Sequence, residues 1–164
     1  MRCLLIGDQR TLTLCGDVLR EKGHDPVGVV TDSELVQGWA ADHGIPCWTA
    51  SEVAADGWRA VREIPCDLLF SIANLRGLPE ALLEHPARGA SNFHDGPLPA
   101  YAGLTTPNWG LLHGETDWQV TWHWMTDQVD GGRILATGDL TIGPQDTGLT
   151  LNLRCMGAAV DAFG

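Results

Sequence analysis

The sequence lacks any long apolar stretch. None of its apolar runs reaches the roughly 18 residues that a membrane-spanning helix needs. The short run at the N-terminus, residues 1–7, has no small-residue cleavage site behind a long apolar core, so it is typical of a first strand and not of a signal peptide. With 164 residues, the chain fits one domain. We expect no membrane partner and a cytoplasmic location.

Basic residues are scarce. Lys and Arg number 10 against 21 Asp and Glu, and the net charge is −11 at pH 7. No cluster of Lys or Arg interrupts this acidic composition. A surface of this sign repels a phosphate backbone, so we expect no nucleic-acid partner.

Cysteine pairs and zinc motifs are also missing. The five cysteines are scattered, and neither Cys-x-x-Cys nor His-Glu-x-x-His occurs. Cys3, Cys15 and Cys66 lie in or beside apolar segments. We therefore predict buried free thiols in a reducing compartment and no metal site.

Glycine-rich phosphate loops are absent too. The turn after the first apolar run reads Gly7-Asp8-Gln9-Arg10-Thr11. It matches neither Gly-x-Gly-x-x-Gly nor the Walker pattern, which disfavours dinucleotide and nucleoside-triphosphate binding.

What the sequence does contain is an alternation of short apolar runs and helical patterns. The apolar runs predict strands at 2–7, 26–31, 45–48, 67–72 and 89–94, and helical spacing predicts helices at 11–22, 33–43, part of 51–63, 79–84 and 107–113. Such alternation predicts an α/β fold, a Rossmann-like doubly wound and mostly parallel sheet with helices on both faces. Two further strands, 119–125 and 133–140, are expected to pair as a hairpin before a last helix that begins near residue 146 or 147.

Two polar residues end the strand predicted at 89–94. Asn92 and His94 are two apart, so their side chains share one face of that strand. Ligands of doubly wound sheets bind at the carboxyl ends of the strands. An amide donor beside an imidazole suits an oxyanion that develops on a carbonyl carbon. The alternative is an asparagine in a turn beside a surface histidine.

Two further polar residues follow in the predicted hairpin. Asp130 lies in an Asp-Gly-Gly sequence, which is typical of a turn, and only proximity to His94 would make it catalytic. His123 alternates with Trp122 and Trp124 and so faces the opposite side from them. We expect His123 to be packed and hydrogen-bonded.

At this point the residues resemble a known family. Asn92-Phe93-His94-Asp95-Gly96-Pro97-Leu98-Pro99, followed by Tyr101-Ala102-Gly103, resembles the formyltransferase signature Asn-x-His-x-Ser-x-Leu-Pro. Further matches in order and spacing are Pro107, Trp109, Gly110, Gly114, Glu115, Val120, Thr121, His123, Met125, Asp130, Gly132, Ile134 and Leu135. The chain is similar to the N-terminal catalytic domain of the formyltetrahydrofolate-dependent formyltransferases. It is most similar to formylation domains at the N-terminus of nonribosomal peptide synthetases.

The resemblance implies a one-carbon transferase with the formyltransferase fold. Formyltetrahydrofolate would be the donor, without a metal, and an amine the acceptor, such as an aminoacyl group on a carrier protein in natural product biosynthesis. The catalytic residues would be Asn92, His94 and Asp130. The residues expected to contact folate are Leu75, Arg76, Gly77 and Leu78, through backbone groups around the pterin, and Thr126, Asp127, Gln128 and Val129 in a second loop.

The resemblance also bears on the domain organisation. The pattern of the last helix still runs at Ala159 and Val160, close to the end of the sequence. We therefore expect residues 1–164 to form a formyltransferase catalytic domain that is a fragment of a longer multidomain chain. Downstream synthetase domains would then be partners.

Two departures from the family pattern stand out. Gly96 replaces the serine of the signature, which would remove a hydroxyl hydrogen bond and loosen the loop. The first turn lacks the phosphate cradle of the glycinamide ribonucleotide enzymes, and Asp8 would repel a phosphate. Two alternatives stay open: a formyltetrahydrofolate hydrolase, or deformylase, and a noncatalytic docking module of a synthetase.

Overall fold

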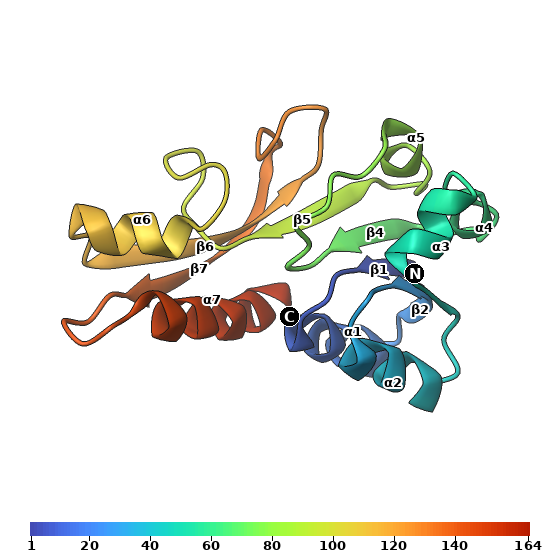
Figure 1. The fold of residues 1–164 in the computed structure, drawn as a ribbon, viewed down its shortest axis with the longest axis horizontal. Helices are drawn as coiled ribbons and strands as arrows, with labels where there is room; N and C mark the ends of the chain where they lie inside the picture. Colours follow the sequence, from blue (N-terminus) through green and yellow to red (C-terminus); the bar gives the residue numbers. More distant parts are fainter. The chain divides into compact units, whose positions relative to one another are not determined.

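The computed structural model describes all of residues 1–164 and divides into two compact units, residues 1–91 and residues 92–164. The elements in chain order are β1 (Arg2–Ile6), α1 (Arg10–Glu21), β2 (Asp25–Val30), α2 (Glu34–Asp42), β3 (Cys47–Trp48), α3 (Ala50–Ala55), α4 (Arg59–Arg62), β4 (Leu68–Ser71), α5 (Glu80–Leu83), β5 (Ala90–His94), α6 (Thr106–His113), β6 (Asp117–Trp124), β7 (Ile134–Thr141) and α7 (Gly148–Phe163) (Figure 1). The predicted elements are confirmed to within a few residues at each end.

The strands form a mostly parallel sheet. Their hydrogen-bonded order is β3-β2-β1-β4-β5-β6-β7. β1 pairs in parallel with β2 and β4, and β2 pairs in parallel with β3, whereas β6 and β7 are antiparallel. The predicted α/β class is therefore confirmed, and so is the hairpin.

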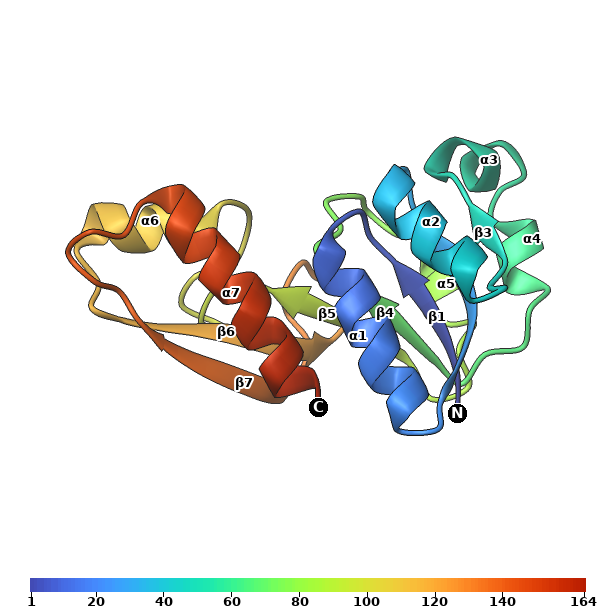
Figure 2. The ribbon, with the colours of Figure 1, turned by 90° about the horizontal axis from the view of Figure 1, so that it is seen from below.

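In the first unit, β1 is buried on both faces. Its residues Cys3, Leu4, Leu5 and Ile6 are all 1% exposed or less, although successive side chains point to opposite faces. α1 and α2 pack on each other and cover one face of this part of the sheet (Figure 2). Continuous burial of this kind explains why the strand appears in the sequence as an unbroken apolar run.

The helix ends follow local capping chemistry. Gly23 has a φ of 75° just after α1, a conformation that glycine favours at the end of a helix. Thr147 caps α7, since its hydroxyl accepts from the amide of Thr150. Thr49 and Glu52 form the same kind of capping box at α3. Such caps fix where each helix begins.

In the second unit, the β6–β7 hairpin packs one face on α7. Residues of β7 alternate between more and less exposed, as an antiparallel sheet with one solvated face requires. The hairpin register shifts between Trp122 and His123, so β7 carries an extra residue at that point. A β carbon on Gly132 would lie 1.7 Å from the carbonyl oxygen of Trp124, so only glycine fits where the hairpin closes.

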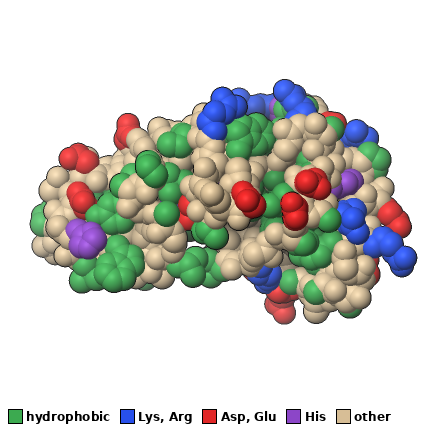
Figure 3. All heavy atoms as spheres, turned by 90° about the horizontal axis from the view of Figure 1, so that it is seen from above, with side chains coloured by type: hydrophobic (Ala, Val, Ile, Leu, Met, Phe, Trp, Pro, Cys, Tyr) green, Lys and Arg blue, Asp and Glu red, His purple; other side chains and the backbone are tan.

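No helix is both long and apolar enough to cross a membrane. All five cysteines are free, and four are buried as predicted, while Cys47 is only half-buried. Figure 3 shows hydrophobic side chains on the surface over and beside α6, where Leu104, Trp109 and Leu112 are exposed.

Candidate active site

The second unit begins with the end of β5, which carries two of the predicted catalytic residues. Asn92 is half-buried and His94 is 5% exposed. Because they are two apart on one strand, they point to the same face, as predicted. The structure brings two more side chains to them, Asp130 and His123.

His94 forms a hydrogen bond through one ring nitrogen and faces a carboxylate with the other. Its Nε2 donates a hydrogen bond to the carbonyl oxygen of Tyr101 at 2.6 Å. Its Nδ1 lies 3.6 Å from Oδ2 of Asp130. Since a carbonyl can only accept, Nε2 must carry a hydrogen, and Nδ1 is the nitrogen that faces the carboxylate.

Asp130 is fixed in an uncommon backbone conformation. Its φ is 54°, in the left-handed region that Asp tolerates better than most residues. Its Oδ2 accepts a hydrogen bond from the amide of Gly103 at 2.8 Å, and its side chain is only 9% exposed. The Asp-Gly-Gly turn therefore also aims a buried carboxylate at His94, which the sequence spacing alone could not show.

His123 also belongs to this cluster, which the sequence did not predict. It is 2% exposed, and its Nδ1 donates to the carbonyl oxygen of Trp124 at 2.9 Å, so the prediction of a packed, hydrogen-bonded histidine is confirmed. Its Nε2 also lies 3.3 Å from Nδ2 of Asn92 and 3.6 Å from Oδ1 of Asp130. The register shift next to His123 places an extra residue in β7 opposite this part of β6.

His123 is neutral in this arrangement. Burial lowers the pKa of the ring, and the opposing effects of the Trp124 carbonyl and of Asp130 do not cancel it. With Nδ1 protonated, the neutral ring has a lone pair on Nε2, which accepts from the amide of Asn92. The 3.6 Å approach to Asp130 is then a contact without an ion pair.

Gly96 leaves no gap in the loop after β5. It is buried, and its carbonyl oxygen accepts from the hydroxyl of Thr121 at 2.9 Å. The space beside its α carbon is filled by Thr106. The loosening expected from the missing serine is thus opposed by neighbouring side chains.

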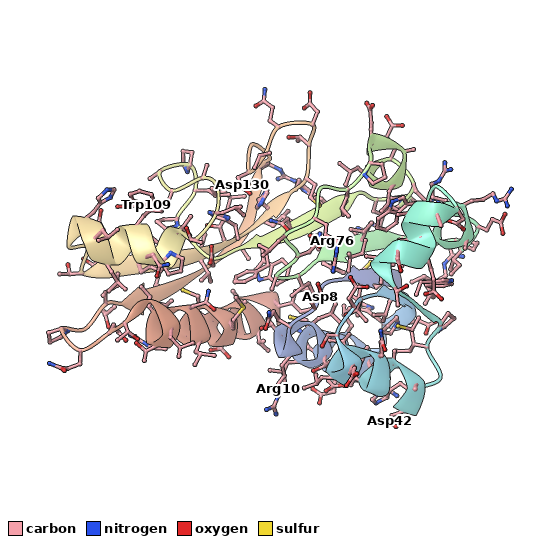
Figure 4. The ribbon with its side chains drawn as sticks, in the orientation of Figure 1. Asp8, Arg10, Asp42, Arg76, Trp109 and Asp130 are labelled. Atoms are coloured by element: carbon pink, nitrogen blue, oxygen red, sulfur yellow. The ribbon has the colours of Figure 1, made fainter.

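The first unit contains the predicted pterin loop. Arg76 forms ion pairs with Asp8 at 2.8 Å and with Asp32 at 2.5 Å. Figure 4 shows Arg76 beside Asp8. Asn74 holds the backbone of Arg76, donating to its carbonyl and accepting from its amide. The backbone groups of Arg76 are therefore occupied. Those of Leu75, Gly77 and Leu78, by contrast, form no hydrogen bond within the first unit.

Asp8 stays ionised in this cluster. Burial acts to raise the pKa of its carboxyl, but hydrogen bonds from the Asp32 amide and the Thr31 hydroxyl outweigh burial, with help from Arg76. The net result is a pKa below the usual range for Asp. The guanidinium thus holds the ends of β1 and β2 to the loop after β4.

The predicted second folate loop lies after β6. Thr126 and Gln128 bond to each other, since the Thr126 hydroxyl donates to the carbonyl of Gln128 and accepts from its amide. Asp127 is exposed. Val129 is 82% exposed, and Leu75 in the first unit is 83% exposed. Each of these two loops thus exposes one apolar side chain of its own unit to solvent.

The cluster in the second unit offers hydrogen-bond donors beside a carboxylate. The second amide hydrogen of Asn92 makes no hydrogen bond within that unit, and Nδ1 of His94 lies at a long distance from Asp130. Such groups can stabilise negative charge that develops on an oxygen. The chain contains no group of three or more His, Cys, Asp or Glu side chains suited to hold a metal ion.

Known proteins resemble this chain along almost its whole length. Residues 3–163 match the Formyl transferase family model. Methionyl-tRNA formyltransferase of Geobacter metallireducens is 34% identical over 149 residues, which cover 83% of this chain and 48% of the relative. The chain therefore spans about half the length of that curated relative.

Solved structures show the same fold. Glycinamide ribonucleotide transformylase 1 from Symbiobacterium toebii superposes with a TM-score of 0.83 at 20% identity, covering 98% of this chain and 82% of the other. A formyltetrahydrofolate deformylase from Pseudomonas syringae pv. tomato gives a TM-score of 0.86 at 18% identity, covering 99% and 58%. The family match over residues 3–163 shows that this chain belongs to the formyl transferase family.

Proposed function

We propose that this chain transfers a formyl group from formyltetrahydrofolate to an amine, with Asn92, His94 and Asp130 as its catalytic residues. The observation that carries the proposal is the buried cluster at the end of β5, in which Nδ1 of His94 lies 3.6 Å from Asp130. Membership in the formyl transferase family supports the reaction class. A decayed site would have no physical need to keep all three polar groups.

Asn92 and His94 would stabilise the charge that develops during transfer. When an amine attacks the formyl carbon, the formyl oxygen gains negative charge. The free amide hydrogen of Asn92 and a hydrogen on His94 can donate to that oxygen, each contributing about 3 kcal/mol. His123, neutral and bonded to Asn92, orients the amide so that its second hydrogen is available.

The tautomer of His94 decides which nitrogen takes part. Nε2 is committed to the carbonyl of Tyr101 at 2.6 Å, so Nδ1 is left to face the substrate and Asp130. In the proposed mechanism Nδ1 also carries a hydrogen, and the Asp130 carboxylate is the acceptor that faces it. The 3.6 Å separation leaves this hydrogen available, because catalytic hydrogen bonds are often long before substrate binds.

Asp130 would also receive the proton of the attacking amine, directly or through a water molecule. The new carbon–nitrogen bond forms to the acceptor, the bond from the formyl carbon to the folate nitrogen breaks, and that nitrogen leaves protonated. No covalent bond to the protein is needed. The exposed Leu75 would contact the pterin.

The acceptor we propose is an aminoacyl group on a carrier protein, with downstream synthetase domains as partners. The support is the similarity of the Asn92–Pro99 segment to formylation domains of peptide synthetases. The ends of β1 and β2 also carry one carboxylate each, Asp8 and Asp32, against one guanidinium. This remaining negative charge disfavours an acceptor that binds there through a phosphate.

A labelled-formyl assay tests the proposal. The purified chain is incubated with isotopically labelled formyltetrahydrofolate and an aminoacyl carrier protein, and mass spectrometry follows the label. Formylated aminoacyl product that depends on the acceptor is expected. Labelled formate released without an acceptor would instead show a hydrolase. No product and no formate, from a folded chain that binds the folate, would show a noncatalytic module.

A further inference from the structure

The loop after β5 contains an unusually tight contact between Gly96 and Thr106. A β carbon built on Gly96 would lie 2.6 Å from Oγ1 of Thr106, 3.0 Å from its Cβ and 3.3 Å from Nε2 of His94. Distances below 3.0 Å are not tolerated by real β carbons. A side chain at position 96 and the present placement of Thr106 therefore exclude each other.

Thr106 cannot easily move aside. It is 1% exposed and is the first residue of α6. A β-branched side chain has few alternative rotamers, and this one is enclosed. Pro107 follows it, and its ring restricts the backbone of Thr106 as well. The absence of a side chain at Gly96 is thus what makes room for Thr106.

The Thr106 hydroxyl has a specific bond. It donates to Oδ1 of Asp95 at 2.7 Å, and Asp95 directly follows His94. Two further groups hold Asp95: the indole nitrogen of Trp118 donates to its carbonyl at 2.9 Å, and the amide of Asn152 donates to Oδ2 at 3.4 Å. The hydroxyl bond thus ties the residue after His94 to the start of α6.

We propose that Gly96 and Thr106 form a compensating pair, in which Thr106 replaces the missing side chain at position 96 and acts as a positioning residue for His94. The hydroxyl holds Asp95 and the loop that carries the Tyr101 carbonyl. That carbonyl fixes the hydrogen on Nε2 and leaves Nδ1 toward Asp130. The consequence for turnover rests on the proposed formyl transfer, whereas the pairing itself does not.

A stability cycle tests the pairing. Gly96→Ser should lower the Tm by about 5 °C because it overpacks the contact with Thr106. Thr106→Ala should lower the Tm by a similar amount, because it empties a buried space and leaves Asp95 without its donor. The double variant should recover to within about 2 °C of the wild-type Tm, because a serine at 96 then occupies the space that Thr106 vacates.

A second pair of variants tests positioning, with Thr106→Ser as the conservative control. Thr106→Val keeps the shape and removes the hydroxyl, whereas Thr106→Ser keeps the hydroxyl. The ring nitrogens of His94 are followed by ¹⁵N NMR, which reports which nitrogen carries hydrogen. We expect a hydrogen fixed on Nε2 in the wild type and in Thr106→Ser, and only partial occupancy of Nε2 by hydrogen in Thr106→Val. For turnover we expect about a tenfold fall in kcat with unchanged KM in Thr106→Val only.

These readouts separate failure of this proposal from failure of the proposed function. Tm losses that simply add in the double variant would overturn the pairing. A His94 NMR signature and a kcat that are the same in Thr106→Val and the wild type would overturn the positioning role. If the wild type transfers no formyl group, the Tm cycle and the NMR tautomer still decide the pairing and the positioning, since neither needs turnover.

Discussion

The two units of this chain use similar polar groups at their strand ends in different ways. In the first unit, Arg76 closes on Asp8 at 2.8 Å and on Asp32 at 2.5 Å. In the second unit, Nδ1 of His94 and Nε2 of His123 each lie 3.6 Å from a carboxylate oxygen of Asp130. Short charge-assisted contacts hold a structure together, whereas longer ones leave room for a third group. The first cluster is therefore suited to hold the structure together, and the second is suited to the catalytic role that we propose for it.

The difference follows from the cationic side chain in the first cluster and the imidazole side chains in the second. A guanidinium offers several donors in a rigid fork and can satisfy two carboxylates together. An imidazole has only two nitrogens, and in both histidines one of them is already bound to a backbone carbonyl. The remaining nitrogens of His94 and His123 converge on one carboxylate, which is itself held by the amide of Gly103. The imidazole cluster is thus held in place without being saturated.

The largest expected effect is loss of turnover in the second unit. Asn92→Ala, His94→Ala and Asp130→Ala should each lower kcat about a hundredfold or more, with the folate Kd nearly unchanged, because these groups act on the transition state. Steady-state kinetics and a folate titration measure the two quantities. Wild-type turnover in all three variants would remove the catalytic assignment.

A smaller effect, on the stability of the fold, is expected when the ion pairs of Arg76 are removed. Arg76→Gln leaves two partly buried carboxylates without their cation, and we expect the free energy of unfolding to fall by about 1–2 kcal/mol. The matched control is Arg2→Gln, which breaks a single ion pair at 3.3 Å and should cost less, because the Arg2 side chain is 48% exposed and that of Arg76 is 32% exposed. Urea unfolding compares them, and equal losses would show that the Arg76 cluster contributes no more than a surface ion pair.

The smallest effect is a difference in how the two clusters make folding stability depend on pH. The pKa of His123 is lowered by burial, so the unfolded chain binds the proton more tightly, and stability falls as pH drops below about 6.5. The pKa of Asp8 is also lowered in the folded state, so its contribution is complete above about pH 4 and is lost only as pH falls further.

Urea unfolding between pH 8 and pH 3 separates these contributions. His123→Asn should flatten the stability profile between about pH 7 and pH 5, while Asp8→Asn should flatten it only below about pH 4. The two variants serve as controls for each other. Profiles that change in the same pH window would contradict the division of roles.

The sequence predicts most of the fold because its signals are local. β1 is a run of apolar residues, α1 ends before a glycine with positive φ, and Thr147 sits three residues before its capping partner. Each of these signals involves neighbours in the chain and needs no knowledge of tertiary contacts. The bounds of the short strand β3, which contains Cys47, are predicted less accurately, since two residues show little periodicity.

The site could be predicted only in part, because its decisive contacts join residues far apart in the chain. The two-residue spacing places Asn92 and His94 on one face, and the family resemblance adds Asp130. Nothing local shows that His123 lies against Asn92, or that Thr106 fills the space beside Gly96. These contacts depend on how β5, β6 and α6 pack, which spacing does not encode.

The most direct test of the central claim is calorimetric titration of the purified chain with 5-formyltetrahydrofolate, a stable isomer of the proposed donor. Asp130→Ala, Leu75→Asp and, as a matched control on α6, Leu112→Asp are titrated in parallel, since Leu75 and Leu112 are both highly exposed. We predict saturable binding by the wild type, by Asp130→Ala and by Leu112→Asp, and much weaker binding by Leu75→Asp. Absence of binding by the folded wild type would contradict a folate-dependent function.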